Sequence, residues 1–222
     1  MGVLLMLMTI GGLVVATILL AVSLFTKKAW LAKFTLGGVA VWFVFYAVML
    51  FGFSIFSKEK TLALNEAKEY CGFYLDCHMH TVVTGVRTAK TIGDRIATGE
   101  FYIVMVKVFS DARNPNITFR LLEPKAEVTD GSGRTFTRNT DAESSLPTTQ
   151  VQLNQDIKGS QTIEKEIVFD ITGPGNDLKL LITEGYGIDK YIEAVLVDDE
   201  DSICHKRTYF KLEEQKQTAG VK

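Results

Sequence analysis

Two long apolar runs begin the chain, and neither contains a charged side chain. The first extends from Val3 to Phe25 and the second from Phe34 to Phe56, 23 residues each. A helix needs roughly 20 residues to cross the ~30 Å hydrocarbon core of a bilayer. Residues 1–57 are therefore predicted to form a two-helix transmembrane anchor (helices 3–25 and 34–56) with membrane lipid as its partner. A cleaved signal peptide fits the first run less well, because no basic residue precedes it and it is longer than a signal h-region.

The short segment between the two runs carries Lys27, Lys28 and Lys33 and no acidic residue. Lysines in short loops favour the cytoplasmic side of a membrane. The segment after the second run also holds three lysines, mixed with three glutamates, so the contrast between the two sides is modest. We expect the loop in the cytoplasm and the larger part of the chain outside it.

Residues 58–78 have a mixed polar composition with many helix formers. They are predicted to form a juxtamembrane stalk and a cysteine-containing turn. We expect the second membrane helix to continue into this stalk for a turn or more.

Beyond residue 78 the pattern changes to short β-branched and apolar runs separated by turn residues. The run Glu100–Phe109 is apolar on both of its alternating faces, which is typical of a central strand, and residues 103–106 are all expected in the core. The segment Asp130–Gly133 reads DGSG and predicts a hairpin turn. Further strands are expected in ITFRLLEP, KAEVTD, GSGRTFTRN, QTIEKEIVFDI, LKLLIT and HKRTYFKL.

About seven or eight strands with regularly spaced turns predict an all-β domain, an antiparallel immunoglobulin-like β-sandwich over residues 79–212. The polar tail, residues 213–222, is expected to be disordered. With the N-terminal transmembrane α-hairpin, this gives one anchor and one exposed domain.

Charge excludes one class of partner. The formal net charge is −2, and the first 57 residues contribute three lysines and no acid. The rest of the chain therefore holds 21 basic and 26 acidic side chains, a net of −5. A mildly acidic domain lacks the basic surface that nucleic-acid binding requires, so no nucleic acid is expected among the partners.

Three stretches give the exposed domain a family resemblance: GEFYIVMVKVFSDARNPN, LLEPKAEVTDGSGRTFTRN and IEKEIVFDI. They resemble the extracytoplasmic immunoglobulin-like domains of bacterial secreted and membrane proteins, of the immunoprotective extracellular protein type. In that pattern a valine-rich strand precedes an Asn-rich turn, a strand enters D-x-x-G-x-x-F, and V-F-D-I follows. The resemblance covers roughly residues 82–212 and implies a fold rather than an activity, in a family usually tethered by a lipid or one helix. It implies the cytoplasmic (inner) membrane of a bacterium, with the soluble domain on the extracytoplasmic side.

Cys71 and Cys77 close a short loop that also holds Gly72 and Asp76. Because an oxidising compartment favours disulfides, the simplest pairing joins these two cysteines and leaves Cys204 free. Such a short loop contributes only about 2 kcal/mol in the chain-entropy model. Pairing of Cys77 with Cys204, which would join the first and last strands, stays open.

His78 and His80 are two residues apart, so a strand would direct both imidazoles to one face. A His-x-His pair can chelate copper or zinc, and His205 and Cys204 are further possible ligands. Surface histidines at the start of a strand are the simpler interpretation, because no third ligand is evident nearby. No cofactor is expected.

Asp198, Asp199, Glu200 and Asp201 form an acidic loop. Calcium prefers several oxygen ligands, but this run lacks the D-x-D-x-D-G spacing of a known calcium loop. A solvated turn between strands is the expected structure.

Motifs of catalysis are missing from the sequence. It contains no G-x-S-x-G elbow, phosphate loop, dinucleotide fingerprint or H-E-x-x-H pair. The chain is therefore predicted not to be an enzyme, but a membrane-tethered extracytoplasmic module that binds or scaffolds a protein partner. The alternative is a metal-handling or thiol-redox accessory protein that uses the Cys and His groups.

Overall fold

The computed structural model describes residues 2–71, 77–185 and 187–213, and the chain divides into two compact units. The helical unit contains residues 1–58 and 187–207, and the sandwich unit contains residues 59–186 and 208–222. Because the two units are interleaved in sequence, the chain passes from one unit to the other three times.

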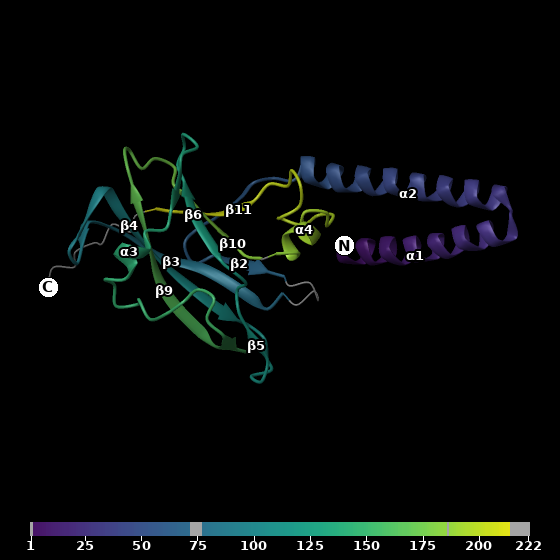
Figure 1. The fold of residues 1–222 in the computed structure, drawn as a ribbon. Helices are drawn as coiled ribbons and strands as arrows, with labels where there is room; N and C mark the ends of the chain where they lie inside the picture. The colour runs from purple at the N-terminus through teal and green to yellow at the C-terminus, as the bar shows by residue number, and fades with distance from the viewer. Residues whose placement is uncertain (1, 72–76, 186, 214–222) are drawn as a thin grey trace. The chain divides into compact units, whose positions relative to one another are not determined.

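Two antiparallel helices form the body of the helical unit (Figure 1). α1 (Gly2–Thr26) and α2 (Ala29–Phe56) confirm the two predicted apolar helices, and both are long and apolar enough to cross a membrane. The indole Nε1 of Trp42 donates a hydrogen bond of 3.0 Å to Thr9 Oγ1, which places these two residues at the same level of the hairpin.

The connection between the helices is shorter than predicted. Lys33, expected in the loop, lies inside α2, and only Lys27 and Lys28 separate the two helices. Alanine, leucine and lysine favour helix, so the segment after Lys28 joins α2. Lys27 adopts a left-handed backbone conformation, with φ of 54°, where the chain reverses.

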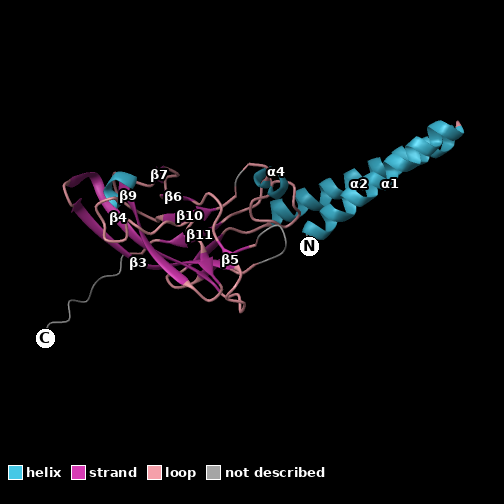
Figure 2. Cartoon of the chain, turned by 60° about the horizontal axis from the view of Figure 1, so that its bottom comes forward, coloured by secondary structure: helices cyan, strands magenta, loops and turns pink. Residues whose placement is uncertain are grey.

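The helical unit also contains a segment that we call the cap, Gly187–Arg207. It includes the short helix α4 (Asp189–Glu193), which lies beside the N-terminal end of α1 in both Figure 1 and Figure 2. The prediction that these residues belong to the sandwich is wrong. The physical reason is that the cap contacts α2 through hydrogen bonds of Tyr46 with Val195 and of Ser54 with Ser202.

Two sheets form the sandwich unit, and their strands are magenta in Figure 2. Sheet A has the order β1-β11-β10-β6-β7, and sheet B has the order β2-β3-β4-β9. All neighbours are antiparallel except β1 and β11. The strands of sheet A are β1 (Lys60–Leu62), β11 (Thr208–Lys211), β10 (Lys179–Thr183), β6 (Lys125–Thr129) and β7 (Thr135–Thr137). Those of sheet B are β2 (Ala67–Tyr70), β3 (Met79–Ile92), β4 (Arg95–Ser110) and β9 (Thr162–Ile171).

The sandwich unit contains three further short elements: β5 (Thr118–Phe119) paired with β8 (Ile157–Lys158), and helix α3 (Thr140–Glu143). The predicted all-β sandwich is thus confirmed, and β4, flanked by β3 and β9, is an interior strand of sheet B. The segment ITFRLLEP supplies only the two residues of β5 rather than a full strand. The tail predicted to be disordered lies outside the described residues from residue 214 onward.

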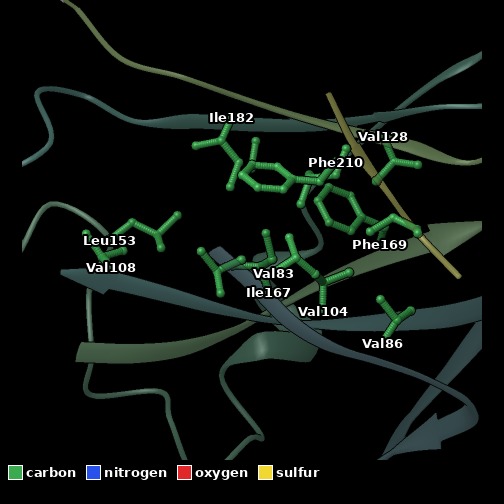
Figure 3. Packing of buried hydrophobic residues seen from close by; sticks show 14 of the residues in the cluster. Val83, Val86, Val104, Val108, Val128, Leu153, Ile167, Phe169, Ile182 and Phe210 are labelled. Atoms are coloured by element: carbon green, nitrogen blue, oxygen red, sulfur yellow. The ribbon is translucent and has the colours of Figure 1, made fainter. Parts of the chain in front are cut away.

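The main core lies between the two sheets (Figure 3). Val104 and Val106 of β4 are 0% exposed and belong to this core, whereas Ile103 packs on the opposite face of sheet B, in a second cluster. Met105 was also expected to be buried but is only partly covered. It lies outside the second cluster, which packs Ala142 of α3 against β4. Side chains that meet in Figure 3 include Val83, Val104, Ile167 and Phe169 from sheet B and Val128, Ile182 and Phe210 from sheet A.

The predicted helical stalk is wrong, because α2 ends at Phe56 and residues 60–62 and 67–70 are strands β1 and β2. Leu62 is buried in the main core, which holds β1 beside β11. On β2, Lys68 Nζ and Tyr70 OH both donate to the carbonyl of Ile182 in the opposite sheet, over 2.9 and 3.1 Å. Tertiary burial therefore overrides the helix-forming composition of this segment.

The DGSG hairpin prediction is confirmed by the pairing of β6 with β7. The carboxylate of Asp130 accepts hydrogen bonds from the backbone N–H groups of Ser132 and Arg134, over 3.0 and 2.9 Å, and from the Arg134 guanidinium. The hydrogen bond from the Ser132 hydroxyl and those from Arg134 lower the pKa of Asp130 to about 2. An ionised Asp130 therefore holds this turn throughout the physiological pH range.

Candidate functional site

His78, His80 and Asp111 meet where β3 begins and β4 ends. In the antiparallel register His80 is opposite Phe109, so two residues further His78 is opposite Asp111. The backbone N–H of Asp111 donates to the carbonyl of His78 over 3.3 Å, which continues the ladder. We call these three residues, His78, His80 and Asp111, the His–Asp cluster.

The Asp111 carboxylate faces both imidazoles. Its Oδ1 lies 2.6 Å from His78 Nδ1, and its Oδ2 lies 3.5 Å from His80 Nε2. His80 stacks on Phe109 with ring centroids 4.9 Å apart, and His78 meets Phe119 edge-on at 6.1 Å. Both imidazoles therefore point to one carboxylate, as the two-residue spacing predicts.

The two histidines differ in exposure. The His80 side chain is 13% exposed and the His78 side chain is 49% exposed. His80 Nε2 is buried and has no hydrogen-bond partner, although Asp111 Oδ2 is 3.5 Å away. A buried polar atom without a hydrogen bond costs about 1–3 kcal/mol. A shift of Asp111 toward His80, or a cation that both could bind, would satisfy this nitrogen.

The electrostatics of the cluster favour an ionised carboxylate. The hydrogen bond with His78 lowers the pKa of Asp111 below its ordinary value, and the positive charge of His80 acts in the same direction. Burial acts against this shift. Asp111 is therefore an anionic neighbour of both imidazoles.

Sequence analysis missed Asp111, which lies 33 residues after His78 in the turn segment SDARNPN. A carboxylate that was not evident from the sequence therefore lies beside the two histidines. No local spacing signals this neighbour, because only the β3–β4 register brings the two segments together. A signal exists at the level of the hairpin: Asp111 closely follows the strand that pairs with the strand carrying His80.

The potential ligand atoms of the His–Asp cluster do not converge on one point. Within residues 2–71, 77–185 and 187–213, these three groups do not place one ligand atom each within 4.8 Å of one another. The group that does so is Glu69, Cys71 and Cys77, but its two sulfur atoms are joined to each other. The interaction that the structure shows is the hydrogen bond between His78 and Asp111, which joins the start of β3 to the segment after β4.

The other predicted ligands, His205 and Cys204, belong to the helical unit and not to the sandwich unit. His205 Nδ1 lies 2.8 Å from the carbonyl oxygen of Lys206, so that nitrogen has a neighbour on its own segment. The four predicted ligands are thus divided between two units, with His78 and His80 in the sandwich unit and Cys204 and His205 in the helical unit.

The cysteines follow the simpler of the two predicted pairings. Cys71 and Cys77 form a disulfide, and Cys204 is a free, exposed thiol. Pairing of Cys77 with Cys204 is thereby excluded. Residues 72–76, which were expected to form the turn inside this loop, lie outside the described residues.

The acidic loop is less solvated than expected. Asp198 is exposed, but Asp199, Glu200 and Asp201 are each partly buried. The backbone N–H of Asp201 donates to Asp199 Oδ1 over 2.9 Å, and Arg207 forms an ion pair with Asp201. Burial raises the pKa of Asp199, and the nearby carboxylates add to this shift. The group of possible metal ligands found among the described residues does not include this loop.

A second charged cluster lies where α3 covers sheet B. Glu143 accepts from Arg138 Nε and Nη2 over 2.9 and 2.6 Å and from the Val168 backbone N–H over 3.1 Å. Lys165 Nζ is 4.0 Å from Glu143 and donates to the Thr148 carbonyl over 3.3 Å. Burial lowers the pKa of Lys165, while Glu143 opposes that shift. Because these groups satisfy one another, the cluster fastens α3 to β9.

A polar hollow of about 480 Å³ lies beside this cluster, lined by residues 135–141 and Asp170. Two of its charged groups are already engaged. Asp170 accepts from the backbone N–H groups of Thr98 and Gly99 over 2.8 and 2.9 Å, and Arg138 is paired with Glu143. The hollow therefore offers hydroxyl and amide groups together with the exposed carboxylate of Asp141.

The two packed sheets define a β-sandwich joined to an apolar helical hairpin. Among solved structures, the chain is similar to MPT63, a secreted protein of Mycobacterium tuberculosis, with 12% identity, a TM-score of 0.47, and 70% of this chain and 98% of that chain covered. It is also similar to an uncharacterised β-sandwich protein of Clostridium difficile 630, with 9% identity, a TM-score of 0.41, and 71% of this chain and 96% of that chain covered. The yjhA protein of Bacillus subtilis is also similar, with 14% identity, a TM-score of 0.41, and 68% of this chain and 98% of that chain covered. No family model and no curated protein matches the chain.

Proposed function

We propose that this chain is a membrane-tethered binding or scaffolding module with no catalysis of its own. Its two apolar helices would span the cytoplasmic (inner) membrane of a bacterium and display an immunoglobulin-like sandwich on the extracytoplasmic side. The observation that carries the proposal is the order of features along the chain. A helical hairpin built on two charge-free apolar runs is followed directly by a domain that has a disulfide between its strands β2 and β3.

The composition of the helices supports an anchor rather than a transport path. No Asp, Glu, Lys, Arg or His lies within 3–25 or 34–56, so neither apolar run offers a charged or proton-carrying group to a solute. Large apolar side chains point outward along both helices, among them Leu4, Val22, Val44 and Ile55. Lipid is the environment in which such a surface is stable.

A contact surface for a protein partner is supported by the β3–β4 hairpin. Pairing of β4 with β9 begins at Glu100, so the hairpin segment before it has no third strand beside it. Ile96 in this segment is 79% exposed. Hydrogen bonds from Thr98 and Gly99 to Asp170 occupy part of the free strand edge, which disfavours strand addition and leaves side-chain contact through Ile96.

Photocrosslinking in intact cells tests this function. A benzoylphenylalanine in place of Ile96 should form a discrete adduct with one protein, because the hairpin segment carries the partner contact. The matched control places the same residue at Asp141, which is also exposed and lies in α3. An Ile96 variant that gives no adduct beyond the Asp141 background would contradict the proposed contact.

Metal handling is the second candidate function, and one observation favours it. The buried His80 Nε2 has no hydrogen-bond partner, while His78 and Asp111 lie beside it. Zinc or copper bound by these groups would satisfy that nitrogen.

Metal content of the purified full chain separates the two candidates. We expect no stoichiometric zinc or copper, because the three ligand atoms do not converge. Stoichiometric metal that is lost on His80→Ala or Asp111→Ala, and kept on His205→Ala in the helical unit, would establish the metal-handling function instead.

A further inference from the structure

The cap packs on the ends of both helices of the hairpin. Tyr46 OH donates to the Val195 carbonyl over 2.7 Å, and the Ser54 and Ser202 hydroxyls lie 3.1 Å apart in a buried contact. At the start of α1, a Cβ built on Gly2 would lie 2.4 Å from the carbonyl oxygen of Val197. Only glycine therefore fits where the cap backbone meets α1.

Helix register gives the level of the cap along the hairpin. Trp42 is level with Thr9, so in an antiparallel pair Gly2 is level with about residue 49 of α2. From there to Phe56, α2 continues for roughly 10 Å at 1.5 Å per residue. The cap lies over the beginning of α1 and beside this last part of α2, through Ser54 and through the bond from the Lys206 N–H to Ser57 Oγ of 2.8 Å.

Apolar side chains of the cap face in two directions. Leu196 and Val197 are buried, whereas Ile188, Tyr191 and Val195 are 72%, 77% and 40% exposed. These three exposed residues are spaced i, i+3 and i+7, and they begin just before α4 and end just after it, so they share one helical face. We call this the Ile188–Tyr191–Val195 face.

We propose that the Ile188–Tyr191–Val195 face lies in lipid, at the boundary between headgroups and acyl chains of the extracytoplasmic leaflet. The inference rests on the proposed membrane anchoring and adds a third point of membrane contact to the two helices. At 25 residues, α1 is about 37 Å long and exceeds a ~30 Å hydrocarbon core, so its first turn, where the cap sits, falls at this boundary. Tyrosine is enriched at that level because its ring is apolar and its hydroxyl is polar.

The lipid-facing surface of the hairpin continues onto this face. Leu4 near the start of α1 and Ile55 near the end of α2 are 65% and 66% exposed. Exposed apolar residues therefore occur on α1, on α2 and on the cap that joins their ends. One solvent, the lipid boundary, accounts for all three surfaces, whereas water would leave the cap face unfavourably hydrated.

Depth-dependent fluorescence quenching tests the proposal on the full chain in liposomes of phosphatidylcholine and phosphatidylglycerol. An NBD label is attached to a single cysteine in a Cys204→Ser background, with the Cys71–Cys77 disulfide intact. The label on Tyr191→Cys should be quenched more strongly by lipid with a shallow doxyl group than by lipid with a deep one. Lys190→Cys, an exposed neighbour on another helical face, should be quenched less than Tyr191→Cys.

Two further positions separate the cap from the anchor. Val44→Cys, in the middle of the second apolar run, should be quenched most strongly by the deep doxyl lipid if α2 spans the bilayer. If Val44→Cys is quenched and Tyr191→Cys is not, the cap proposal is wrong and the anchor stands. If neither is quenched, the anchor is wrong and the cap proposal falls with it.

Discussion

A Val104→Asp chain should not fold its sandwich unit. Val104 is 0% exposed and lies in the middle of β4, between Val86 of β3 and Ile167 of β9. Its side chain belongs to the core between the sheets, so a carboxylate there would have no counter-charge among the apolar residues of the cluster.

The size of the effect follows from the chemistry. An unpaired buried carboxylate costs several kcal/mol, on top of the lost packing of the valine. A domain of this size has a total stability of about 5–15 kcal/mol. The substitution should therefore remove most or all of the cooperative unfolding transition of the sandwich.

The same substitution elsewhere on the same strand provides the control. Ile96 is 79% exposed near the start of β4, so Ile96→Asp should leave the transition close to that of the unmodified chain. Urea unfolding of the detergent-solubilised chain, followed by near-ultraviolet circular dichroism, measures both variants. A Val104→Asp chain with a native-like transition would show that β4 is not the central strand.

Strong local patterns were enough to predict the helices and the centre of the sandwich. The two apolar runs, the two-sided apolar strand around Val104 and the DGSG turn each determine one element through residues that are adjacent in sequence. The Cys71–Cys77 disulfide is of the same kind, because its partners are six residues apart. Such features depend on short-range chemistry and need no knowledge of the packed fold.

What sequence analysis missed depends on contacts between distant segments. The segments of β1 and β2 were predicted to be a stalk because their own composition favours helix. Their strands instead depend on distant contacts: Leu62 packs in the main core, and Tyr70 donates a hydrogen bond to the Ile182 carbonyl, 112 residues away. The cap was predicted to be part of the sandwich because nothing in its sequence reveals that the Val195 carbonyl accepts a hydrogen bond from Tyr46. Met105 lies on the same face of sheet B as Ile103, as the alternation along β4 predicts. It is nevertheless partly exposed, because it lies outside the cluster that packs against α3.

The candidate site shows the same division. The spacing of His78 and His80 correctly predicted that both imidazoles share a direction. Asp111, which gives the cluster its charge, enters through strand pairing and could not be found from that spacing. The supposed ligands Cys204 and His205 instead belong to the helical unit, because the chain leaves the sandwich between β10 and β11.

Membrane topology has the second large expected effect, because labelling from one side of a membrane is close to all-or-none. The hairpin loop carries Lys27 and Lys28, with Lys33 in the first part of α2, and no acidic residue. These lysines favour the cytoplasm, which would place the sandwich on the other side of the membrane. The disulfide in the sandwich unit agrees with that side, because reducing conditions in the cytoplasm disfavour disulfides.

The most direct test of the account is the reaction of single cysteines with a membrane-impermeant maleimide, in a Cys204→Ser background. Ile96→Cys reports on the sandwich, and Ala29→Cys, at the start of α2, reports on the loop side. We expect Ile96→Cys to react in intact cells and Ala29→Cys to react only after the membrane is permeabilised. Reaction of Ala29→Cys in intact cells, with Ile96→Cys protected until permeabilisation, would contradict the proposed extracytoplasmic module.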